Sequence, residues 1–207
     1  MTEAKKSDGW TTVGDLRREK ADLLKSDPAY RAAVEEADAE RRERARALAQ
    51  AEMPIVSDLQ GVGVEVNSVW DLVNTSQPYE AALPVLMEHL ERGGYPDRVM
   101  ESLARAVSTK TASGYWRRLR DLYVRARGLG ELEGLAGALA ATATAEVFDD
   151  LVEVVHYEPA GDSRVLLLKA VVRTGRERGW AVIEELQSDP VLSREASARL
   201  KRRHQRR

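Results

Sequence analysis

The sequence predicts an all-α protein: an α-solenoid of about four helix pairs, preceded by an N-terminal helical extension. Three observations lead to this fold class. Apolar residues recur at helical spacing along most of the chain. Helix-pair patterns begin near Tyr79, Ala112, Ala145 and Glu177, at intervals of about 33 residues, a period typical of stacked helix pairs. Aromatic residues make up only 5% of the chain, whereas alanine, leucine, arginine and glutamate are abundant.

Composition excludes several classes of protein. The 207 residues carry 32 basic and 34 acidic side chains, a net charge of -2, which argues against a dedicated nucleic-acid binder. Cysteine is absent, so disulfides, a catalytic thiol and thiolate metal sites are excluded. Because no apolar signal core and no long apolar run is present, we expect a cytoplasmic protein with no membrane partner. The excess of arginine over lysine suggests GC-rich coding in a bacterium or phage.

Residues 11–77 are expected to form the helical extension, after a disordered N-terminus at 1–10. Thr11 or Thr12 can cap a helix that runs to about Lys25. Asp27 then caps a second helix that starts at Pro28, where proline is well tolerated.

The second helix is expected to reach about residue 60, with a kink or a division at Pro54. Its middle, residues 35–46, is highly charged and contains the acid-before-base pairs Asp38–Arg42 and Glu40–Arg44. We interpret it as a long charged helix that is packed at its ends and solvated in its middle. A dimerising coiled coil would need clean heptads that are absent here.

Residues 61–77 connect this helix to the repeats. Gly61 and Gly63 end the helix, and residues 62–66 alternate like a strand but have no partner strand, so we predict a linker. Ser68 can cap a short helix in which Trp70 faces inward and anchors the extension on the repeats.

The repeats are predicted to cover residues 78–202. Arg98–Val99 in the first unit aligns with Arg164–Val165 in the third. The second unit keeps the apolar spacing but lacks the early arginine, and its Gly134 and Gly137 predict a close approach between helices. The fourth unit is short and ends in strong charge, as a capping repeat should, followed by a basic tail at 203–207.

The first and third units resemble the HEAT repeat: a first helix with a Leu-Pro-apolar-Leu core, a short turn with Asp or Pro, and a second helix that opens near an arginine. The resemblance implies a right-handed solenoid whose second helices line a concave surface. It also implies that an inter-repeat ladder is formed by Asp97, Arg98, Asp162 and Arg164.

No pattern predicts catalysis, and we expect neither an enzyme nor a metal or small-molecule cofactor. The three histidines, His89, His156 and His204, lie far apart and in no ligand motif. The chain contains no nucleophile elbow and no phosphate-binding P-loop.

The leading hypothesis is a protein-binding adaptor or regulator, and an antitoxin-like or immunity-like inhibitor is one such role. Mixed charge on a concave helical surface suits protein recognition. Arg98, Glu101, Ser102 and Arg105 are expected to face outward on this surface. The predicted partner-binding residues are Arg98, Glu101, Arg105, Arg164 and Lys169.

The alternative is a nucleic-acid-binding protein of the same architecture. Trp116 lies beside Arg117, Arg118 and Arg120, and an aromatic ring next to arginines can stack on a base and bind phosphates. Further basic residues cluster at Arg173, Arg176 and Arg178 and in the tail. Acidic residues are interleaved through the same repeats, so the overall field favours a protein partner.

Overall fold

A computed structural model describes residues 12–205, and the segments 1–11 and 206–207 lie outside it. The expected disorder of residues 1–10 and the last two residues of the basic tail therefore fall outside the described part. Between residues 12 and 205 the chain is helical and contains no strand, which confirms the all-α prediction. The chain divides into two compact units, residues 1–47 and 48–207, which are described separately.

The N-terminal unit begins with α1 (Val13–Ser26). The Thr12 hydroxyl accepts a hydrogen bond from the Asp15 amide, and the Asp15 carboxylate accepts one from the Thr12 amide. This reciprocal pair is a capping box, and it confirms Thr12 as the cap. No residue of α1 is buried, and its apolar residues Val13, Leu16 and Leu23 are exposed.

The long helix α2 (Pro28–Gly61) begins in the first unit. Asp27 caps it, because its Oδ1 accepts from the amides of Ala29 and Tyr30. Glu40 pairs with Arg44 as predicted, whereas Asp38 pairs with Arg41. The helix runs through Pro54 as one element, so the expected division of the helix at this residue is wrong.

The C-terminal unit starts with the last turns of α2, where Ile55 and Leu59 are fully buried. Residues 62–66 form the predicted linker and lead to α3 (Trp70–Val73). The Ser68 hydroxyl accepts from the Trp70 amide at 3.2 Å and donates to the buried carboxylate of Glu52 at 2.6 Å. These bonds fix α3 to the end of α2.

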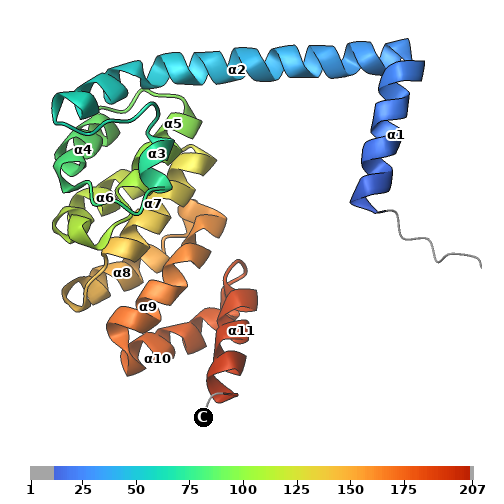
Figure 1. Ribbon diagram of the computed structural model, residues 1–207. Helices are drawn as coiled ribbons and strands as arrows, with labels where there is room; N and C mark the ends of the chain where they lie inside the picture. The colour runs from blue at the N-terminus through green and yellow to red at the C-terminus, as the bar shows by residue number, and fades with distance from the viewer. Residues whose placement is uncertain (1–11, 206–207) are drawn as a thin grey trace, which may run out of the picture. The chain divides into compact units, whose positions relative to one another are not determined.

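Eight further helices follow one another through the C-terminal unit from green to red in Figure 1. They lie within the four predicted pairs: α4 (Leu83–Arg92) and α5 (Asp97–Ala106), α6 (Trp116–Tyr123) and α7 (Leu129–Thr142), α8 (Phe148–Val155) and α9 (Leu168–Gly175), α10 (Glu177–Glu185) and α11 (Ser193–His204). Arg203 and His204 of the expected basic tail therefore belong to the last turn of α11.

Short 3-10 helices precede or follow these α-helices. They are η1 (Glu80–Ala82), η2 (Lys110–Tyr115), η3 (Ala145–Val147), η4 (Glu158–Leu167) and η5 (Leu186–Ser188). They occupy turns that helical periodicity also fits, so α6, α8 and α9 contain only eight residues each.

One apolar core runs through the C-terminal unit, and neighbouring helices contribute to it in turn. Leu103 of α5, Leu119 of α6 and Leu135 of α7 are all fully buried. A close approach joins α5 and α7. A Cβ at Gly134 would lie 2.8 Å from Cβ of Ala104, whereas one at Gly137 would make only an ordinary 3.7 Å contact with Ser108. The predicted close approach is therefore confirmed at Gly134 only.

Within residues 12–205, no helix is both long enough and apolar enough to cross a membrane.

Candidate functional site

The predicted surface on α5 is an internal ion-pair network. Glu101 is only 7% exposed, and its carboxylate accepts from Arg98 at 2.6 Å and from Arg105 at 2.7 Å. Ser102 is fully buried and donates to the carbonyl of Val99. The outward orientation expected of Glu101 and Ser102 is therefore wrong, because the neighbouring helix α7 covers this side of α5.

Arg98 and Arg105 remain at the surface but are held in place. The Arg98 guanidinium lies 4.2 Å from the ring centre of the half-buried Trp70, in a cation–π contact. Arg105 also lies 3.5 Å from the carboxylate of Glu133 on α7. A partner that binds here has to compete with these internal contacts.

Arg164 is not at the surface. It is 1% exposed, forms an ion pair with Asp189 at 2.9 Å and donates to the carbonyl of Val155. The surface position predicted for Arg164 is wrong, because η4 turns its side chain toward the segment before α11. Burial by itself would raise the pKa of Asp189, but hydrogen bonds from the Leu192 amide and Arg164 outweigh this effect and lower the pKa.

The ladder implied by the HEAT resemblance has a different form here. Asp97 accepts from the amides of Gly130 and Glu131, both at 2.9 Å, and so caps α7. Arg164 bonds to Asp189, and Asp162 is exposed. Asp97 contacts the later helix α7 and Arg164 contacts the segment before α11, but the two residues do not bond to each other.

The residues of the predicted nucleic-acid cluster do not form one exposed binding surface. Trp116 is 1% exposed, and its indole N–H donates to the carbonyl of Leu139 at 3.3 Å, so the ring cannot stack on a base. Arg118 forms a bidentate pair with Glu91, and Arg120 pairs with Asp121 and Asp150. Arg117 alone stays exposed with no ion pair inside the described part of the chain.

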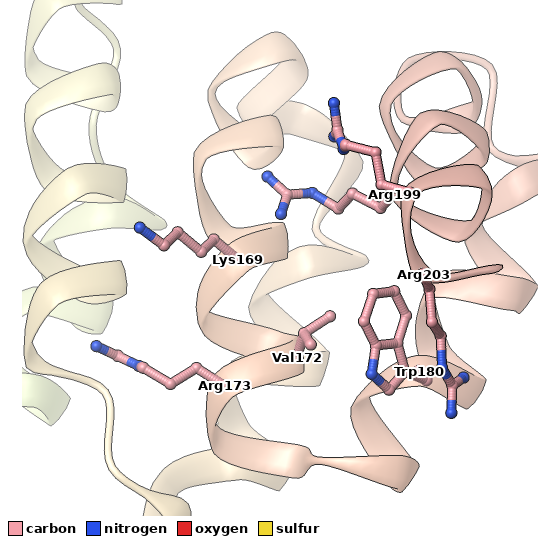
Figure 2. A pocket seen from close by; sticks show the side chains of 7 residues that line it. Lys169, Val172, Arg173, Trp180, Arg199 and Arg203 are labelled. Carbon is pink, nitrogen blue, oxygen red and sulfur yellow. The ribbon is translucent and has the colours of Figure 1, made fainter. Parts of the chain in front are cut away.

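Basic side chains gather instead around a hollow of about 480 Å³, which we call the α9–α11 hollow. Figure 2 shows Lys169, Val172 and Arg173 along α9, Trp180 on α10, and Arg199 and Arg203 on α11. Arg202 completes the lining. Of the five predicted partner-binding residues, only Lys169 lies here, and it is exposed.

The cations of this hollow differ in how they are paired. Arg203 lies 4.7 Å from the Trp180 ring and pairs with Glu177 and Glu184. Arg199 and Arg202 both pair with Glu195; the buried Nε of Arg199 lies 2.9 Å from this carboxylate but outside hydrogen-bond geometry. Within residues 12–205, neither Lys169 nor Arg173 has a carboxylate partner. The positive charge of the hollow is therefore concentrated on the α9 side.

A second hollow, of about 340 Å³, shares Arg173 with the first. We call it the α7–α9 hollow. Its lining consists of Lys110, Ser113, the segment 141–145, Arg173, Thr174 and Arg176. Arg173 is fixed in the wall because its guanidinium donates to the carbonyls of Ala140 at 2.6 Å and Ala143 at 3.0 Å.

Arg176 has an unusual backbone. In the described part of the chain it is the one residue other than glycine with positive φ, at 51°. This conformation costs about 1–3 kcal/mol in a residue with a side chain. The preceding residue, Gly175, has no room for a side chain, because a Cβ there would lie 2.1 Å from the ring of Phe148. Arg176 joins α9 to α10, and its backbone is therefore strained at this junction.

The sequence indicates some of the cations of this region but does not indicate Lys110. It identified the cluster of Arg173, Arg176 and Arg178, but Arg178 turns away to pair with Asp149. Lys110 ends the first repeat unit and Arg176 ends the third, so no local spacing links the two residues. Its signal is the period itself, because residues about two periods apart can face one space between stacked pairs.

The remaining titratable groups in the described part of the chain do not form a metal site. His89 is buried between Asp58 and Tyr95, at 3.0 Å and 2.6 Å from its ring nitrogens. Within residues 12–205, no group of three or more potential ligands is placed to hold a metal ion. Comparison of the chain with protein-family models, with curated proteins and with solved structures finds no match.

Proposed function

We propose that this chain is a non-catalytic protein-binding adaptor or regulator, in which the helix pairs form a HEAT-like solenoid and a partner segment binds in the α9–α11 hollow. The observation that carries the proposal is that two cations of this hollow have no carboxylate partner in the described part of the chain. Lys169 and Arg173 have no carboxylate partner and flank the apolar surface of Val172 and Trp180. Such a surface suits a segment with both acidic and apolar side chains.

The α5 surface is the weaker place for a partner. Glu101 already neutralises Arg98 and Arg105, and an incoming acidic group would gain little from cations that are paired. The packing of successive helices supports the solenoid, since each repeat in such proteins contacts mainly its neighbours.

A protein segment is favoured over nucleic acid because carboxylates surround the hollow. Glu177, Glu184 and Glu195 lie among its arginines and would repel a long phosphate backbone. A short segment can place one or two carboxylates at Lys169 and Arg173 and avoid these glutamates.

Fluorescence anisotropy with three short probes tests the proposal. The probes are a peptide with two glutamates around a leucine, the same peptide with glutamines, and single-stranded DNA. At about 0.15 M salt we expect the glutamate peptide to bind best. Lys169→Glu should weaken its binding about tenfold, equivalent to ~1.4 kcal/mol.

Arg117→Glu is the matched control, because it reverses one exposed, unpaired cation away from the hollow. It should bind the glutamate peptide as the wild type does. Equal binding of the glutamine peptide, or tighter binding of the DNA, would contradict an acidic protein segment as the ligand.

A further inference from the structure

We infer that the α7–α9 hollow is a binding site for a phosphate group, either free or carried on another molecule. This inference concerns the neighbouring hollow, which shares Arg173 with the proposed peptide site but is otherwise lined by different residues. It rests on the donors that line the hollow, on their lack of internal partners and on the backbone of Arg176.

The lining is rich in hydrogen-bond donors and holds no carboxylate. Lys110 comes from η2, Arg173 from α9, and Arg176 from the junction of α9 and α10. Three cations from separate segments thus face one hollow. Charge-assisted hydrogen bonds from several directions suit a tetrahedral oxyanion better than a planar carboxylate.

Most of these donors have no partner within the protein. The Lys110 ammonium, the Arg176 guanidinium and the hydroxyls of Ser113 and Thr144 make no side-chain hydrogen bond or ion pair within residues 12–205. Elsewhere on this surface arginines usually find a carboxylate, as Arg118 and Arg178 do. The donors of the hollow therefore remain free for a ligand.

Arg173 supplies a fixed wall. The carbonyls of Ala140 in the last turn of α7 and of Ala143 just after it hold its guanidinium, so one cation is already positioned before a ligand arrives. A positioned group loses less freedom on binding than a mobile one.

The backbone of Arg176 is the independent observation. Positive φ favours glycine, yet an arginine occupies this position, and its side chain lines the hollow. Strained residues cluster at ligand sites, where the side chain is needed in spite of its backbone. In this hollow, the role that fits the arginine is to bind an anion.

Arg176→Gly provides a sharp test, because it removes the guanidinium and relieves the strained backbone together. We expect the variant to bind inorganic phosphate at least about tenfold more weakly in isothermal titration calorimetry. Its melting temperature without phosphate should equal or exceed that of the wild type. Loss of binding then cannot be attributed to unfolding.

Further variants define the site. Lys110→Ala should also weaken phosphate binding, whereas Arg117→Ala, which removes a surface charge elsewhere, should leave it unchanged. Lys169→Glu, which disrupts the proposed peptide site, should change phosphate affinity much less than Arg176→Gly does, because Lys169 does not line the α7–α9 hollow. Failure of the peptide site and failure of the phosphate site are thus distinguishable.

A parallel titration with a short phosphoserine peptide separates the two sources of phosphate. Tighter binding of the peptide assigns the site to a phosphorylated protein, and tighter binding of inorganic phosphate assigns it to the free anion. Either result supports the site. Binding of neither probe by the wild type, or equal binding by the wild type and Arg176→Gly, would overturn the inference.

Discussion

Burial of individual residues decides which side chains can bind a partner. Trp116 and Arg164 look like surface residues in the sequence. Trp116 is next to arginines, and Arg164 lies near the predicted start of the second helix of the third repeat unit. Both are 1% exposed. Their burial depends on Leu139, 23 residues away in the other helix of the same pair, and on Asp189, 25 residues away in the next unit. Periodicity within a single helix contains no information on such contacts.

The Arg164–Asp189 pair gives a prediction of pH dependence. The pKa of Asp189 is lowered in the folded protein, so its ionised form stabilises the fold above the pKa of the unfolded chain. This stabilisation is lost as the pH falls through the folded pKa. Asp189→Asn should lower the free energy of unfolding by about 1.5–3 kcal/mol near neutral pH.

Urea unfolding of wild type and variant from about pH 7 to about pH 3 measures the effect. The difference between the two proteins should shrink below about pH 4. Asp162→Asn is the control, because Asp162 is exposed and should show a small difference that does not vary with pH. A constant difference for Asp189→Asn would mean that its charge does not stabilise the fold.

At the scale of elements, the sequence predicts helices well where a cap or a breaker defines them. Thr12, Asp27 and Pro28 mark the starts of α1 and α2 because their chemistry acts within a few residues. The 3-10 helices were not predicted, since their hydrogen bonds span three residues rather than four and the same residue types suit both. The ends of α6, α8 and α9 are set by these turns.

The contact between α5 and α7 provides a paired test. Gly134→Ala adds a methyl group 2.9 Å from the Glu101 carbonyl and should destabilise the protein by about 1–3 kcal/mol. Gly137→Ala in the same helix meets only Ser108 at 3.7 Å and should stabilise it by roughly 0.5–1 kcal/mol.

Thermal and urea unfolding of both variants distinguish packing from helix propensity. Propensity alone would make both substitutions stabilising. If Gly134→Ala were as stable as Gly137→Ala, the two helices would not be in the close contact described here.

At the scale of the whole molecule, the two hollows are made by residues from different repeat units. Lys110, Thr144 and Arg176 come together through the stacking of helices, and no single segment contains the site. The sequence shows that arginines gather near residue 175 but not which of them remain unpaired. Pairing depends on the positions of carboxylates such as Glu195 and Asp149 in three dimensions.

The separation into two units predicts the result of a truncation. Because α1 buries no residue and the apolar core lies in residues 48–207, a chain that starts near residue 45 should keep its cooperative unfolding. Its free energy of unfolding should change by less than about 0.5 kcal/mol. Circular dichroism during thermal unfolding measures this. A large loss of stability would show that the N-terminal unit supports the core.

The packing of each helix against those close to it in the sequence also bears on how fast the chain folds. Contacts such as those between α4 and α5 or α10 and α11 require only short loops to close. Proteins with such local contacts fold in about microseconds to milliseconds. Partly folded chains with exposed apolar surface should therefore be short-lived during synthesis. Each helix pair can pack as soon as the following helix pair leaves the ribosome.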